Sequence, residues 1–177
     1  MFDRNPSTRI DYRTVLDDLD LLALVAEFTP MVIGTPPLEL DLPTSDIDIA
    51  CSASNLNDFE IAVRKHFGNL PGFQVRKTEV RERSAVIASF FSHDWELELF
   101  CQMLPVERQF GFQHFMIEQR LLAIDARLRA IVLSLRQQGL KTEHAFAAAL
   151  ALPGDPYDAL LALSPLSDEA LKKMIVN

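Results

Sequence analysis

The strongest structural signal in this chain is Val32-Ile33-Gly34-Thr35, followed after ten residues by Asp46-Ile47-Asp48-Ile49. An apolar strand ends at a small-residue turn, and a second strand then carries two carboxylates at positions i and i+2. Because side chains two apart on a strand point to the same face, Asp46 and Asp48 should stand together while the isoleucines face the core. Adjacent anions repel each other unless a cation lies between them, and Mg²⁺ is commonly held by one or two carboxylates together with substrate phosphates. The pair therefore predicts a metal–phosphate site.

A third carboxylate is offered by the segment Asp94–Phe100, which alternates polar and apolar residues over the length of a strand. Glu96 and Glu98 share one face of this segment, and its apolar residues face the other way. If this strand lies beside the strand of Asp46 and Asp48, three or four carboxylates converge at one point. Such a cluster would complete a site for a divalent cation.

The three segments together carry a resemblance to a known family. Gly34-Thr35, Asp46-Ile47-Asp48-Ile49 and Leu97-Glu98-Leu99 resemble the three-part signature of the nucleotidyltransferase superfamily, whose fold is shared with DNA polymerase beta. Residues 13–125 are also similar to a small bacterial family that is assigned to this fold and has no established function. The resemblance implies a metal-dependent transfer of a nucleoside monophosphate from a nucleoside triphosphate (NTP) to the hydroxyl of an unknown acceptor.

The resemblance also implies a role for each carboxylate. Asp46 and Asp48 would bind Mg²⁺ or Mn²⁺, and Glu98 would bind the catalytic metal and help to activate the acceptor hydroxyl. Glu96 competes for this third position, but the apolar neighbours of Glu98 match the signature better. Paired metal ions stabilise both the attacking and the leaving oxygen in such a reaction.

The residues implied near the triphosphate are Gly34, Thr35 and Ser45. Glycine suits a close approach of the backbone because it has no Cβ. Thr35 stands where the superfamily usually has Ser. The next segment, Pro36–Pro43, has three prolines, two acids and no Lys or Arg, which argues against the helix that usually follows the turn. This loop favours the alternative of a non-catalytic nucleotidyltransferase-like module that binds nucleotide or metal, or serves as an interaction protein.

Hydrophobic periodicity predicts an α+β fold, a mixed β-sheet flanked by helices, with a C-terminal helical extension. We expect the nucleotidyltransferase-like α/β core to span residues 1–105. The predicted strands are 31–33, 47–50, 73–80, 84–91 and 95–101, and the predicted helices of the core are 12–28 and 58–67.

Residues 106–177 should form a helical region packed on the core. Its longest apolar stripe recurs at spacings of four and three, at Ile117, Leu121, Ile124, Leu128, Ile131 and Leu135. The stripe predicts one long helix that ends at Gly139, followed by helices over 142–151, 156–163 and 167–175. We interpret it as packing on the chain's own sheet and later helices; a coiled-coil-like homodimer seam is the alternative.

Three polar residues on this predicted helix invite a functional interpretation. His114 and Glu118 lie four apart and share a face. They point at the carboxylate cluster or form an exposed pair, and the sequence leaves both open. Arg120 is expected to pair with Glu118, with phosphate binding as the alternative.

Composition limits the partners and the compartment. The 17 Lys and Arg residues against 25 Asp and Glu give a formal net charge of -8, which disfavours nonspecific binding to nucleic acid or to anionic membranes. Cys51 and Cys101 each follow a carboxylate by three residues, so we expect them to be buried free thiols of neighbouring strands. No signal peptide is visible and no apolar run approaches the ~20 residues of a membrane span, which predicts a cytoplasmic protein.

Overall fold

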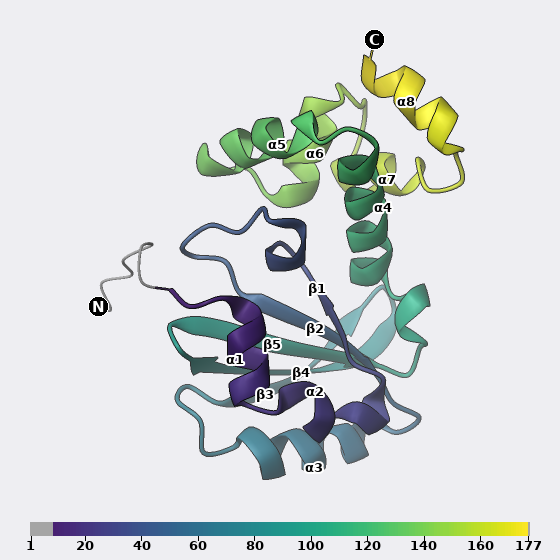
Figure 1. The fold of residues 1–177 in the computed structure, drawn as a ribbon. Coiled ribbons are helices and arrows are strands. Elements are labelled where there is room, and N and C mark those ends of the chain that lie inside the picture. The colour runs from purple at the N-terminus through teal and green to yellow at the C-terminus, as the bar shows by residue number, and fades with distance from the viewer. Residues whose placement is uncertain (1–8, 177) are drawn as a thin grey trace.

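Five strands form one mixed sheet (Figure 1). The computed structural model describes residues 9–176, so the expected absence of a leader at the N-terminus lies outside the described residues. The strands are β1 (Met31–Ile33), β2 (Ile47–Ser52), β3 (Gln74–Val80), β4 (Arg83–Ser92) and β5 (Trp95–Gln102). Their order is β1-β2-β5-β4-β3, with β2 and β5 parallel and all other neighbours antiparallel. The predicted α+β fold with a mixed sheet is confirmed.

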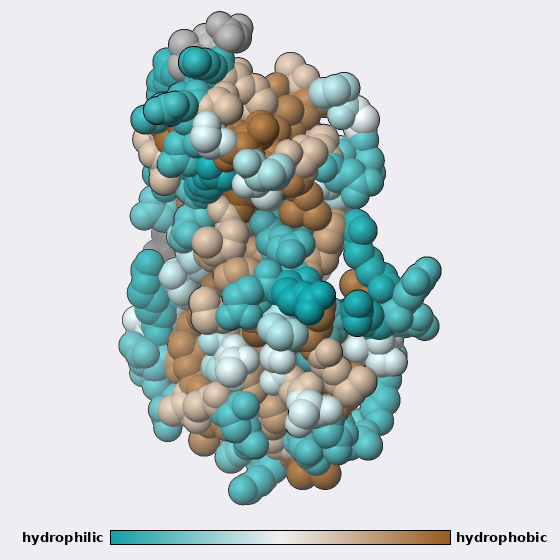
Figure 2. All heavy atoms as spheres, turned by 90° about the vertical axis from the view of Figure 1, so that its right-hand side faces the viewer, coloured by the Kyte–Doolittle hydropathy of each residue, from teal (hydrophilic) through white to brown (hydrophobic). Residues whose placement is uncertain are grey.

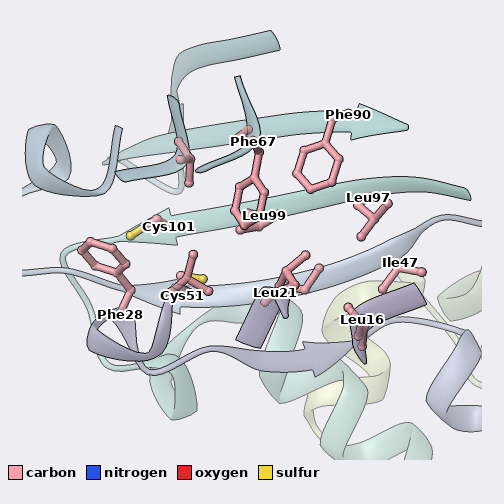
Figure 3. Close-up of a cluster of buried hydrophobic side chains, with 14 of the residues drawn as sticks. Leu16, Leu21, Phe28, Ile47, Cys51, Phe67, Phe90, Leu97, Leu99 and Cys101 are labelled. Carbon is pink, nitrogen blue, oxygen red and sulfur yellow. The ribbon is translucent and has the colours of Figure 1, made fainter. Parts of the chain in front are cut away.

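One face of the sheet is covered by the helices that precede β3 (Figure 1). They are α1 (Tyr12–Asp18), α2 (Leu21–Leu24), the 3-10 helix η1 (Ala26–Phe28) and α3 (Leu56–Phe67). Alternate residues of β2 and β5 point towards them, so Ile47, Leu97 and Leu99 are fully buried. Figure 3 shows this core, in which the rings of Phe67 and Phe90 stack with their centroids 4.9 Å apart. Because this face takes the apolar residues, the opposite face of β2 and β5 carries the polar ones.

The two cysteines are neighbours in this core. Cys51 of β2 lies directly opposite Cys101 of β5 in the register of the parallel pair, and both sulfurs point into the cluster of Figure 3. Both residues are buried and free. The prediction of two buried thiols on neighbouring strands is confirmed.

The prediction of a single helix over residues 12–28 is wrong, because this segment is interrupted. The chain breaks at Asp20, whose φ of 48° is left-handed, and continues as α2 and η1. A short polar side chain tolerates this conformation better than most residues do. Leu16 and Leu21, five positions apart, would point to different sides of one straight helix. The break lets both side chains enter the same core.

The predicted long helix of the C-terminal part is also broken. The helices are η3 (Val106–Arg108), α4 (Phe110–Ile124), α5 (Arg127–Gln137), α6 (Thr142–Ala149), α7 (Pro156–Leu161) and α8 (Asp168–Val176). Asp125 leaves the helical conformation, and its carboxylate accepts a hydrogen bond from the N–H of Arg127 at 2.9 Å. Aspartate competes with the helix in this way because its side chain can cap the next one. The stripe is therefore not continuous, and Ile131, its second-last residue, is 48% exposed.

A second hydrophobic core joins these helices to the loop after β1. Leu121, Leu128, Phe146 and Leu160 are buried in it with Leu38 and Leu40. Leu38 and Leu40 are each at most 2% exposed. The proline-containing loop therefore packs under the C-terminal helices.

Arg120 does not pair with Glu118. Its guanidinium donates to the carboxylate of Asp168 at 2.7 Å and to the carbonyl of Ser164 at 3.0 Å. The expected pair is wrong because Glu118 lies on the buried side of α4, while Arg120 lies nearer its surface. The bonds of Arg120 tie α4 to α8 instead.

The outer surface is mixed in character. Figure 2 shows apolar residues gathered among hydrophilic ones in the upper half of the molecule, where the C-terminal helices lie. Met116, Ile131 and Leu166 are exposed apolar residues of this part. Within residues 9–176, none of the helices combines the length and the apolar character needed to cross a membrane.

Candidate functional site

A cavity of about 460 Å³ lies between the polar face of the sheet and the C-terminal helices. Strands β1, β2 and β5, the loop after β1 and helices α4, α5 and α6 contribute to its wall. The residues that the sequence places near metal or phosphate all line it: Gly34, Thr35, Ser45, Asp46, Asp48 and Glu98. Glu96, the competitor for the third carboxylate position, is not among the lining residues.

The carboxylates come together because β2 and β5 are parallel neighbours. Asp48 is directly opposite Glu98 in their register, and both side chains point away from the core that buries Ile47 and Leu97. Asp46 precedes β2 and shares the polar side of Asp48. Burial raises the pKa of Asp48 to about 8, and the negative charges of Asp46 and Glu98 add to this effect. The site therefore has an excess of negative charge that a cation would relieve.

Glu98 has a cationic neighbour from the sheet. The guanidinium of Arg76 on β3 donates to Oε2 of Glu98 at 3.2 Å. Burial raises the pKa of Glu98, and the positive charge of Arg76 opposes that rise. Asp48 and Glu98 thus differ in environment although they face each other.

Gly34 brings the backbone of the turn against Asp48. Its φ is +78°, and a Cβ at this position would lie 2.5 Å from Oδ2 of Asp48. Both the backbone conformation and the close approach therefore require glycine.

The hydroxyls of Thr35 and Ser45 meet at the base of the loop. Oγ1 of Thr35 donates to Oγ of Ser45 at 3.3 Å, and Ser45 Oγ accepts from the N–H of Leu42 at 2.9 Å. Both residues are buried. The two hydroxyls close the loop on itself, next to the carboxylates.

The proline-containing loop is held by arginines from elsewhere in the chain. It forms no α-helix, as expected, but a single 3-10 turn, η2 (Pro36–Leu38). The guanidinium of Arg9 donates to the carbonyl of Pro43 at 3.0 Å, and that of Arg129 to the carbonyl of Leu38 at 3.3 Å. These contacts fix a loop that lacks basic residues of its own.

Arg136 supplies a positive charge to the cavity. It lies on α5, lines the cavity and donates to the carbonyl of Leu40. Sequence analysis missed this residue, because it is about a hundred positions from the Gly34 turn and no local pattern links the two. Burial lowers the pKa of Arg136, while the negative charges of Glu118 and Asp46 oppose that effect.

A second group of side chains lies on the helical wall. Donor atoms of His114 and Glu118 on α4 and of Glu143 on α6 all lie within 4.8 Å of one another. Among the described residues, this is the one group of three candidate metal ligands whose donor atoms lie so close together. Asp46, Asp48 and Glu98 line the same cavity, but their oxygens do not form a group with such short separations. His114 is 3% and Glu118 4% exposed, so the interpretation as an exposed helix pair is wrong. Glu143 was not singled out by any sequence pattern.

Burial shifts the ionisation of this second group. It lowers the pKa of His114 and raises that of Glu118 well above its ordinary value. The neighbouring charge of Glu143 adds to the rise at Glu118. The lowered pKa of His114 favours a neutral imidazole, which is the form that can bind a metal ion.

Comparison with known proteins identifies the family and the fold of this chain, but not its activity. A family model described as a domain of unknown function (DUF4269) matches residues 14–163. No curated protein matches the chain.

Solved nucleotidyltransferase structures share the fold. An RNA terminal uridylyl transferase, Cid1, superimposes with a TM-score of 0.53 at 14% identity, covering 84% of this chain and 45% of that chain. The Cid1 poly(U) polymerase with bound MgGTP gives 0.55 at 12% identity, covering 88% and 49%. The GLD-2/RNP-8 complex gives 0.55 at 10% identity, covering 84% and 55%. The predicted nucleotidyltransferase fold is confirmed, and the chain spans about half the length of these proteins.

Proposed function

We propose that this chain, which belongs to the DUF4269 family of unknown function, is a metal-dependent nucleotidyltransferase. It would transfer a nucleoside monophosphate from an NTP to a hydroxyl acceptor. The observation that carries this proposal is the register of β2 and β5, which sets Asp48 opposite Glu98 on the wall of a cavity. Two segments about fifty residues apart in sequence thereby supply the three carboxylates that the signature requires.

The residues present fit a hard divalent cation. Asp46, Asp48 and Glu98 offer only oxygen donors, which are the ligands that Mg²⁺ and Mn²⁺ prefer. The raised pKa of Asp48 reflects burial near other negative charges, so a cation would stabilise its ionised form. When bound, such ions would stabilise the negative charge of the phosphoryl group and of the attacking oxygen.

The triphosphate would lie between the Gly34 turn and α5. The backbone of the Gly34 turn would face the phosphate oxygens beside Asp48, and Thr35 and Ser45 offer hydroxyls. Arg136 would bind the phosphates from the opposite wall through its planar guanidinium. It takes the place of the basic residue that the loop after Gly34 lacks.

Glu98 would receive the proton of the acceptor hydroxyl. Its Oε2 is bonded to Arg76, so the proton would pass to Oε1. The acceptor oxygen would then form a bond to the α-phosphorus of the NTP, and the bond from that phosphorus to pyrophosphate would break. A positioned carboxylate contributes to such a step as a general base.

Two parts of the chain would form the site together. We propose a core over residues 1–105 that carries the carboxylates and a helical region over 106–177 that closes the cavity. Cid1, whose fold is similar, is an RNA terminal uridylyl transferase, but the net charge of -8 of this chain favours an acceptor that is not polyanionic. The buried free thiols suit a reducing compartment such as the cytoplasm.

The alternative is a nucleotidyltransferase-like module that binds without turnover. The bonded pair of Thr35 and Ser45 favours it, because a hydroxyl engaged within the loop is less available to a phosphate. The two functions differ in one outcome, the release of pyrophosphate.

The proposal is tested by calorimetric titration of ATP, GTP, CTP and UTP into the protein in the presence of Mn²⁺. We expect metal-dependent binding of at least one nucleotide, and its loss in Asp46→Asn/Asp48→Asn. The matched control is Asp17→Asn/Asp18→Asn on the exposed side of α1. Absence of binding by the wild type would refute the proposal, and binding without pyrophosphate release for any offered acceptor would support the module.

A further inference from the structure

We propose that His114, Glu118 and Glu143 form a second metal site, for a borderline divalent transition-metal ion such as Zn²⁺. It is separate from the carboxylate site on the sheet. Its ligands come from α4 and α6, which form the helical wall of the cavity.

Helix geometry brings the three side chains together. His114 and Glu118 are four residues apart on α4, so their side chains lie on the same face, about one turn apart. Glu143 projects from the first turn of α6. One donor atom of each residue lies within 4.8 Å of the others, a spacing that a single ion can bridge.

Three polar atoms of this group are buried and have no hydrogen-bond partner among the described residues. Neither Nδ1 nor Nε2 of His114 has a hydrogen bond, and neither does Oε1 of Glu118. At 3% and 4% exposure these side chains do not reach bulk water. Buried polar groups in proteins are almost always satisfied, so three orphaned atoms at one point indicate a missing partner. A metal ion would bind one nitrogen of the imidazole and an oxygen of the Glu118 carboxylate at once.

The donor set selects the class of metal. One imidazole nitrogen with two carboxylate oxygens suits Zn²⁺, which commonly takes three protein ligands and one water. Imidazole is a poor ligand for Mg²⁺, which prefers oxygen. Two ionised carboxylates would also neutralise the charge of the ion, which makes burial of the assembly feasible.

The site would fasten α6 to α4. Both helices border the cavity, and Glu143 and His114 lie on its wall with Asp48. A bound ion would fix the distance between the helices and thereby the width of the cavity. This role depends on no reaction at the carboxylates and stands apart from the proposed transferase function.

The test uses the full chain after removal of metal with a chelator. Calorimetric titration with ZnCl₂, without nucleotide or Mg²⁺, should show one tightly bound ion per chain and a higher melting temperature. Elemental analysis after dialysis gives the stoichiometry independently. With Co²⁺ as the probe, visible absorption bands would report ligation by the protein.

Variants separate this site from the carboxylate site. His114→Asn and Glu143→Gln should each weaken Zn²⁺ binding by more than about 100-fold and abolish the Co²⁺ bands. His66→Asn and Glu107→Gln, outside the cavity, are the matched controls and should bind normally. Asp46→Asn/Asp48→Asn should keep Zn²⁺ and lose only nucleotide.

Two outcomes would overturn the proposal. One is a wild type that retains no Zn²⁺ after dialysis. The other is Zn²⁺ binding that survives His114→Asn and Glu143→Gln but disappears in Asp46→Asn/Asp48→Asn, which would place the ion at the sheet. Because Glu143 is only partly buried, Glu143→Gln should fold even if His114→Asn does not, and circular dichroism checks both.

Discussion

Gly34 combines a left-handed backbone with a close approach to a carboxylate. Gly34→Ala should cost about 1–2 kcal/mol of unfolding free energy for the positive φ alone. The new Cβ would also displace Oδ2 of Asp48, so we expect affinity for metal and nucleotide to fall by about 10- to 100-fold. Chemical denaturation and calorimetry measure the two effects.

Gly139 is the matched control for this change. Its φ is +98°, and a Cβ there would meet nothing within 4 Å. Gly139→Ala should therefore lose similar stability and keep normal nucleotide binding. Equal loss of binding in the two variants would mean that the contact with Asp48 has no role.

Asp48 should make the metal-free protein less stable as the pH rises. Its folded pKa of about 8 lies above its ordinary value of 3.8, so the folded state binds this proton more tightly than the unfolded chain does. The resulting stability is fully present below about pH 4 and is lost as the pH rises through about 8. In EDTA, Asp48→Asn should gain at least about 1 kcal/mol over the wild type between about pH 5 and pH 8.

Denaturation curves at several pH values check this sign. Asp17→Asn, at an exposed position, should keep a constant difference from the wild type. A difference between Asp48→Asn and the wild type that does not change with pH would contradict the account of the buried carboxylate.

The buried side of the β2–β5 pair carries Cys51 and Cys101, and their burial predicts how they react. Burial raises the pKa of Cys101 to about 12 and raises that of the Cys51 thiol as well. Thiolates react and thiols do not, so a thiol-reactive aromatic disulfide should label neither residue in the folded protein near pH 8. Both should react after denaturation; fewer than two reactive thiols would mean that the pair is oxidised.

Alternation along strands is what made the carboxylate site predictable. Asp48 and Glu98 each sit between apolar residues, and the period of two fixes which face each side chain takes. The parallel pairing that sets them opposite each other is not contained in either strand. It follows from the order of all five strands in the sheet, which no local pattern of either strand predicts.

Helical periodicity predicted the C-terminal helices less accurately than alternation predicted the strands. The apolar spacing runs across Asp125 without interruption, because Leu121 and Leu128 enter the same core from two different helices. Asp125 ends one helix and caps the next, so the chain changes direction there, although the apolar spacing in the sequence continues unchanged. The group of His114, Glu118 and Glu143 depends on that path, so sequence could suggest its first two members but not the third.

The cavity exists because two separate hydrophobic cores meet across it. The core under the sheet fixes the carboxylates, and the core of the C-terminal helices fixes Arg136. Arg136→Gln should weaken NTP binding by about tenfold or more, because a charge-assisted hydrogen bond to phosphate is lost.

Arg129→Gln is the control for that loss. Arg129 lies on the same helix and also donates to a carbonyl of the loop, but it does not line the cavity. Titration of both variants with the same nucleotide should show normal affinity for Arg129→Gln. If the two variants lose equal affinity, Arg136 acts by holding the loop and not by binding phosphate.

The most direct measurement is anomalous diffraction from crystals grown with Mn²⁺ and a non-hydrolysable NTP analogue. We expect a manganese peak between Asp46 and Asp48, with Glu98 in reach and the triphosphate beside the Gly34 turn. A nucleotide bound elsewhere, or the absence of manganese from these carboxylates in crystals that contain the nucleotide, would contradict the assignment of a nucleotidyltransferase site.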